Sequence, residues 1–296
     1  MFKAYLVRSF FQEALTPDSF YVNLKGLEQW AAREKNPVNR AILNSLLAAS
    51  YSGYVMNNSW ELRNRTSLDM DEKEAPEDIR EWSGNLFAGR VLKYSGEALK
   101  DFGALQKAST RAYIPFTVLG DASRYYGHDM YHVLVSRAVD ALKQVASLGA
   151  ETDSVCNREI NGIFDRAVEL YRTVPDGGDA VILMELDRLD WERNGHGGFR
   201  PDVKGRTAEA DTYLQKIDGL IAAYGGRDVC AEVYFAKANY YQRKSKNSKA
   251  LAVCDEAMAR YPKYSRIAAL KNLRSEILYP MLSMNTSKTT YPGDSL

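Results

Sequence analysis

The sequence has few cysteines, few histidines and no excess of charge of either sign. Its 296 residues include three histidines and three cysteines, Cys156, Cys230 and Cys254. Three scattered cysteines, with no Cys-x-x-Cys pair, predict neither a disulfide framework nor a zinc site, and we expect them to be small buried side chains. Lys and Arg total 39 against 38 for Asp and Glu. Without a basic excess for phosphate contacts, a dedicated nucleic-acid binder is excluded.

Long hydrophobic runs are also missing. A membrane-spanning helix needs about 20 mostly apolar residues, whereas the apolar runs here are short, as in Ala180–Met184. We therefore expect no membrane span. Lys3, Arg8 and Glu13 interrupt any signal-peptide core near the N-terminus, so no targeting signal is predicted there.

Apolar residues recur every three to four positions along most of the chain, which predicts amphipathic helices. Two helices are expected to begin at prolines, one after Asn36-Pro37 and one after Ala75-Pro76, where the missing proline N–H has no cost. The second would carry a stripe of Ile79, Trp82 and Leu86. Between them, the polar stretch 57–73 is predicted to be a long loop.

In the next part of the chain, a stretch without regular apolar spacing is followed by one with a strong helical period. Residues 109–127 are expected to be extended or irregular, and a long core helix is expected from Asp129 to Gly149. Two further helices are predicted to form a hairpin, the first ending near Pro175 and the second beginning after Gly178. Helices continue to about Leu278, before a tail in which Leu282 and Met284 alternate with polar residues.

A repeated spacing indicates stacked helical hairpins. The segments Asp165–Tyr171, Asp218–Tyr224 and Asp255–Tyr261 share the pattern Asp-x5-Tyr at expected helix ends. With Ala231 as position one, seven tetratricopeptide positions carry the expected residue sizes, namely Tyr234, Ala238, Tyr241, Ala250, Cys254, Ala257 and Pro262. The predicted fold class is all-α, an α-α superhelix of tetratricopeptide-like hairpins with a short β start at the C-terminal end.

The same patterns suggest three regions. Residues 1–150 form an N-terminal helical region with long loops, and residues 151–280 contain the tetratricopeptide-like repeats. Residues 281–296 form a tail or the start of a β-domain.

One cluster resembles a metal site. His128 and His132 lie four residues apart on one helix face, as zinc ligands do, with Asp129 where a metalloprotease has its glutamate base and Glu151 as a third ligand. The alternative is structural, with Asp129 capping the helix and His132 partly packed. The second interpretation is favoured because the metalloprotease motif requires Glu.

No other catalytic pattern is present. The glycines around His196 lack the Lys-Ser or Lys-Thr of a phosphate loop, and there is no Gly-x-Ser-x-Gly motif. We therefore predict no catalytic residue, no cofactor, no metal and no enzymatic activity. Arg124, Tyr125 and Tyr126 lie in an expected loop and are the candidate surface contacts.

Several segments resemble the N-terminal helical region of large bacterial alpha-2-macroglobulin-like proteins. The resemblance is carried by residues 15–48, by APEDIREWSGNLF, by residues 112–138 and by YPKYSRIAALKNLRSEILYPMLSM. It implies export to the periplasm or cell envelope, often as a lipoprotein, and membership of a protein that traps proteases. None of the three cysteines belongs to a Cys-x-Glu-Gln thioester, so this chain cannot inhibit proteases covalently by itself.

These observations lead to three functional hypotheses. The first is a non-catalytic interaction or scaffold module, whose partner is another domain of its parent chain, an envelope protein or a protease. The second is a tetratricopeptide-like lipoprotein domain that binds a glycan or an envelope protein, which exposed aromatic residues would favour. The third is a degenerate zinc metalloprotease using His128 and His132.

Overall fold

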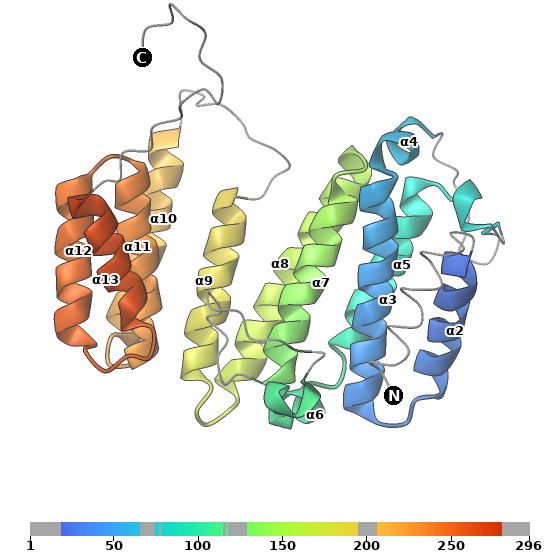
Figure 1. Ribbon diagram of the computed structural model, residues 1–296, viewed down its shortest axis with the longest axis horizontal. Coiled ribbons are helices and arrows are strands. Elements are labelled where there is room, and N and C mark those ends of the chain that lie inside the picture. Colours follow the sequence, from blue (N-terminus) through green and yellow to red (C-terminus); the bar gives the residue numbers. More distant parts are fainter. Residues whose placement is uncertain are drawn as a thin grey trace, which may run out of the picture. The chain divides into compact units, whose positions relative to one another are not determined.

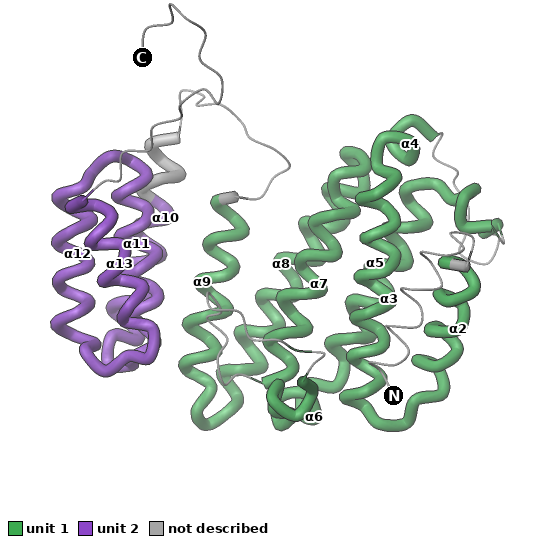
Figure 2. Tube along the Cα trace, viewed as in Figure 1, with its two compact units in different colours: residues 1–206 green, residues 207–296 purple. Residues whose placement is uncertain are grey.

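The computed structural model describes residues 19–65, 75–76, 78–114, 117, 129–194 and 206–279. Within these ranges it contains twelve α-helices and no β-strand (Figure 1). The predicted all-α class is confirmed. The chain divides into two compact units, Met1–Arg206 and Thr207–Leu296 (Figure 2). None of the described helices combines the length and the hydropathy needed to cross a membrane.

Unit 1 is a row of helices packed side by side. Its helices are α2 (Ser19–Arg33), α3 (Pro37–Asn57), α4 (Ser59–Asn64), α5 (Gly84–Ala98), α6 (Phe102–Lys107), α7 (Met130–Ala146), α8 (Ala150–Arg172) and α9 (Gly178–Asn194). Helix α3 packs against α2, α5 and α7, while α8 packs between α7 and α9. The core of the row includes Ile42, Leu43 and Leu47 of α3, which are completely buried.

The helix starts follow local signals in the sequence. Asn36 caps α3, and its Oδ1 accepts hydrogen bonds from the N–H groups of Val38 and Asn39, both at 3.0 Å. Asp129 caps α7 by accepting from the His132 N–H at 3.0 Å. These bonds satisfy N–H groups that the first turn of a helix leaves without a partner. The predicted starts of α3 and α7 are confirmed.

Unit 2 contains the helical hairpin that the repeat pattern predicted. It comprises α10 (Arg206–Tyr224), α11 (Ala231–Arg243), α12 (Asn247–Arg260) and α13 (Ile267–Leu278). The small residues of the pattern, Ala238, Ala250, Cys254 and Ala257, are completely buried, and α11 packs against α12. Small side chains at these positions let the two helices approach closely. Tyr261, directly after α12, donates from its hydroxyl to the Gly225 carbonyl at 2.9 Å.

The predicted helix after Ala75-Pro76 is wrong. Ile79–Glu81 form only a 3₁₀ turn, Trp82 is extended, and α5 begins at Gly84. The reason is tertiary packing. The Trp82 indole N–H donates to the Pro76 carbonyl at 2.8 Å, and the ring is buried in a stack against Tyr51, with ring centroids 5.8 Å apart.

Two predicted irregular stretches also contain helix. Of residues 57–73, Ser59–Asn64 form α4, because Leu62 is buried and anchors a short helix within an otherwise polar stretch. Of residues 109–127, Thr110–Tyr113 form a 3₁₀ turn in which Thr110 is buried. Helices α8 and α9 form the predicted hairpin, and they belong to unit 1. The predicted C-terminal β start, 281–296, lies outside the described residues.

Candidate functional site

The surface contacts predicted from the sequence cannot be placed. Arg124, Tyr125 and Tyr126 lie outside the described residues, and so does His128. The residues around this segment are described on its C-terminal side, where α7 begins.

At the start of α7, the side chains of the zinc hypothesis have structural contacts. Asp129 Oδ1 caps the helix and also accepts a hydrogen bond from the Tyr171 hydroxyl at 2.7 Å. His132 is completely buried, and its Nε2 lies 3.7 Å from Asp187 Oδ2 of α9. The predicted helix cap is therefore confirmed, with His132 more deeply buried than expected. Glu151, the suggested third ligand, is exposed in the first turn of α8.

Among the residues that the structure describes, no group of three His, Cys, Asp or Glu side chains could hold a metal ion. Asp129 accepts two hydrogen bonds, from the His132 N–H and from the Tyr171 hydroxyl. This is the environment of a structural carboxylate rather than of a general base. Because His128 is not described, the zinc hypothesis stays an untested prediction.

A different surface stands out at the end of α3, where α4 carries the most exposed large apolar side chain among the described residues. Trp60 is 80% exposed. Asn58 joins α3 to α4, donating from both its N–H and its Nδ2 to the Tyr54 carbonyl. One turn later, Leu62 points into the core and is 4% exposed. The chain thus holds Trp60 in solvent on a helix whose opposite side is buried.

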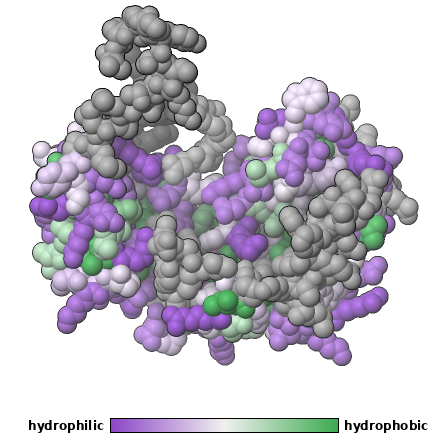
Figure 3. All heavy atoms as spheres, viewed as in Figure 1, coloured by the Kyte–Doolittle hydropathy of each residue, from purple (hydrophilic) through white to green (hydrophobic). Residues whose placement is uncertain are grey.

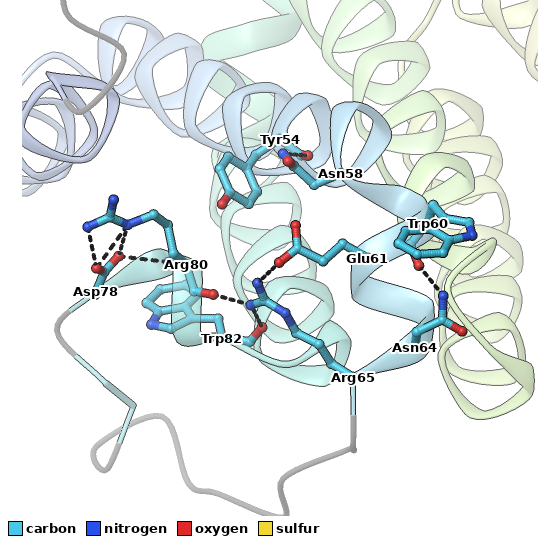
Figure 4. Close-up of polar contacts among 9 residues, drawn as sticks. All are labelled: Tyr54, Asn58, Trp60, Glu61, Asn64, Arg65, Asp78, Arg80 and Trp82. Atoms are coloured by element: carbon cyan, nitrogen blue, oxygen red, sulfur yellow. Dashed lines mark hydrogen bonds and ion pairs between the residues drawn. The ribbon is translucent and has the colours of Figure 1, made fainter.

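Polar contacts fix α4 on two flanks, and Figure 4 shows the one at Arg65. On one flank, Arg65 donates to Glu61, to the Arg80 carbonyl and to the Trp82 carbonyl, the last at 3.2 Å. On the other, Arg63 Nε donates to the Ser147 carbonyl just after α7, at 3.0 Å. These charge-assisted bonds to main-chain atoms tie a six-residue helix to two separate parts of unit 1.

Charges at the Arg65 flank are compensated locally. Arg65 pairs with Glu61, and Arg80 pairs with Asp78 at 2.7 Å. Hydrogen bonds from the Arg80 side chain and from the Arg80 backbone N–H, together with the ion pair, hold the pKa of the Asp78 carboxyl below its usual range. Arg65 and Arg80 of this flank are therefore each paired with a carboxylate.

Three aromatic rings stack around Tyr54 of α3. The Tyr54 ring stacks between Phe20 and Phe87, with centroid distances of 5.5 and 5.1 Å. Burial is the main cause that raises the pKa of Tyr54, and the nearby Arg65 opposes it. Phe87 is completely buried and Phe20 and Tyr54 are partly buried, whereas Trp60 is largely exposed.

The surroundings of Trp60 are mostly polar. In Figure 3, hydrophilic residues dominate the coloured surface of the face shown, and hydrophobic residues form small separate patches. Around Trp60, Glu61, Arg63 and Asn64 are all exposed, and Met56 of the preceding turn is 57% exposed. This arrangement suits noncovalent binding, since it offers an aromatic surface with hydrogen-bonding groups at its edge.

Sequence reasoning missed this surface. Trp60 falls inside the stretch 57–73, which the sequence predicts to be a loop, and Trp82, which the sequence places on a helix stripe, is buried. An isolated tryptophan within a polar segment was the available signal, because a polar segment offers it little core in which to be buried.

Comparison with protein families, with curated proteins and with solved structures found no match to this chain.

Proposed function

We propose that this chain is a non-catalytic helical interaction module of a periplasmic or surface macroglobulin-like protease-trapping protein. The observation that supports it best is the architecture, in which helical hairpins pack in series within each unit. Stacked hairpins present extended surfaces, and proteins built in this way bind peptides or neighbouring domains without catalytic groups. The macroglobulin-like parent and its location rest on the resemblance of the sequence segments alone.

The partner is a protein, either another domain of the parent chain, an envelope protein or a protease. The test is to immobilise the purified chain and challenge it with envelope extract, then to repeat the binding with each captured protein in purified form. We expect one protein to bind directly, with an affinity that purified chain in solution competes away. The proposal is overturned if the purified chain turns over a substrate at a rate that one side-chain change abolishes.

A second candidate, a glycan-binding domain, is favoured by one specific observation. Exposed aromatic residues are what a sugar-binding helical protein needs, and Trp60 is largely exposed on an anchored helix. Binding of oligosaccharides by the purified chain tests this candidate independently of any protein partner.

A further inference from the structure

We propose that Trp60, Arg63 and Asn64 on the outer face of α4 form a binding site for a pyranose sugar. This inference rests on the second candidate function and names its site.

The geometry of α4 brings the three side chains together. Successive residues of an α-helix are turned by about 100°, so positions i, i+3 and i+4 share one face. Trp60, Arg63 and Asn64 occupy these positions, and Trp60 and Asn64 lie opposite Leu62, which is buried. All three are exposed. The outer face of α4 therefore carries one aromatic ring, one guanidinium and one amide within a single helical turn.

Trp60 offers the stacking surface. Among the described residues its indole N–H has no hydrogen-bond partner, and Figure 4 shows the ring turned away from the Arg65 cluster. A pyranose ring has one face of C–H groups that can cover an indole, which removes apolar surface from water. The indole N–H remains available at the edge of the stack.

Arg63 and Asn64 supply complementary polar groups. Arg63 Nε donates to the Ser147 carbonyl, which fixes the side chain and leaves both terminal nitrogens as donors. Asn64 Nδ2 donates to the Trp60 carbonyl at 2.8 Å, which leaves the Asn64 Oδ1 as an acceptor. A sugar hydroxyl both donates and accepts, so adjacent hydroxyls match a donor and an acceptor held side by side.

The polar surroundings favour a sugar over a protein at this position. A stable protein interface buries roughly 800 Å² on each partner around an apolar centre. Among the described residues near this position, the exposed apolar side chains are Trp60 and Met56, and the other exposed side chains of α4 are polar or charged. A ligand that is apolar on one face and rich in hydroxyls at its rim fits this pattern more closely.

The experiment titrates the full chain with hexasaccharides of glucose, mannose and N-acetylglucosamine, using calorimetry and tryptophan fluorescence. Of the four tryptophans, Trp82 and Trp191 are buried and Trp30 is partly exposed, so the fluorescence change that disappears in Trp60→Ala is the one that reports on Trp60. We expect at least one hexasaccharide to bind, Trp60→Ala to weaken it more than tenfold, and Arg63→Ala and Asn64→Ala to weaken it severalfold. Val22→Ala is the matched control, because it removes an exposed apolar side chain from a different helix, α2, and it should bind normally. Circular dichroism verifies that each variant is folded.

Each other outcome overturns the proposal in a distinguishable way. If a hexasaccharide binds equally well to folded Trp60→Ala, the glycan function stands and the site is elsewhere. If none of the hexasaccharides binds, both the site and the glycan candidate are rejected. Loss of a protein partner in Trp60→Ala, together with no sugar binding, would instead assign this face to protein docking.

Discussion

At the scale of single residues, Glu28 connects three elements of unit 1 through one carboxylate. Its Oε1 accepts hydrogen bonds from the hydroxyls of Tyr51 on α3 and Tyr94 on α5, at 2.8 and 2.6 Å. Arg90 Nη1 lies 3.7 Å from the same oxygen. Burial is the main cause that raises the pKa of Tyr51 and of Tyr94, and the Glu28 carboxylate adds to it. Both tyrosines therefore stay neutral donors at physiological pH.

Replacing Glu28 should destabilise unit 1. Glu28→Ala leaves two buried hydroxyls without their acceptor, and we expect the free energy of unfolding to fall by about 2–4 kcal/mol. Urea denaturation followed by circular dichroism measures it. Glu97→Ala removes an exposed carboxylate of α5 whose pairing with Lys100 spans 3.5 Å, and it should change stability by less than about 0.5 kcal/mol. Equal effects of the two substitutions would contradict this role for Glu28.

Buried thiol and phenol groups predict that stability is lost at alkaline pH. Burial, with help from Asp255, raises the pKa of Cys254 to about 11 from an ordinary value of 9.0. Burial likewise raises the pKa of Tyr131 to about 12 from 10.0. Above the ordinary values the unfolded chain loses protons that the folded chain retains, so rising pH favours unfolding.

We therefore expect the free energy of unfolding to change little near neutral pH and to fall between about pH 9 and pH 12. Urea titrations at a series of pH values measure this slope. Cys254→Ala should make the decline between pH 9 and pH 11 shallower, because it removes one of the titrating groups. A decline that is identical in the variant would show that Cys254 does not contribute.

At the scale of elements, the turn between α8 and α9 depends on a glycine. A Cβ added at Gly177 would lie 2.0 Å from the Tyr171 carbonyl oxygen, while the Gly177 N–H donates to the Val174 carbonyl at 3.0 Å. Backbone atoms cannot move aside as a flexible side chain can. The close approach of the chain to the end of α8 therefore requires a residue without a side chain.

Gly177→Ala should lower the free energy of unfolding by about 1–3 kcal/mol, because the α8–α9 turn must open. Gly53→Ala is the matched control, since a Cβ at this position in α3 meets nothing within 4 Å. It should raise stability by about 0.5–1 kcal/mol through the higher helix propensity of alanine. Thermal and urea unfolding of the two variants measure the difference, and opposite signs are the expected result.

At the scale of the whole molecule, each unit has its own buried core. In unit 2, Glu232 of α11 is 2% exposed and accepts from the Tyr264 hydroxyl at 2.9 Å and from Arg266 Nη1 at 2.7 Å. Removing one partner of a buried ion pair leaves the other charge uncompensated, which is strongly destabilising.

We expect residues 207–296 to fold alone, with a helical circular dichroism spectrum and a cooperative thermal transition. Glu232→Ala should lower the midpoint of that transition and should lower the unit 2 transition of the full chain by a similar amount. A fragment without helical signal would show that the core of unit 2 is insufficient for folding. Tyr279→Ala, which alters an exposed side chain, should leave the midpoint unchanged.

The sequence by itself determined the helical class, most helix positions and the α11–α12 hairpin. These features depend on local information, namely the spacing of apolar residues, the caps at Asn36 and Asp129 and the small residues that allow two helices to approach. The α8–α9 hairpin was predictable for the same reason.

Only the tertiary structure decided which side chains are covered. The sequence predicts a loop around Trp60 and a helix around Trp82, yet Trp82 is extended and stacks on Tyr51, while Trp60 faces solvent on α4. Burial depends on what distant segments pack against a residue, and periodicity within one segment carries no information about them. The candidate site followed from that packing, because Arg65 and Arg63 hold α4 through carbonyls 17 and 84 residues away in sequence.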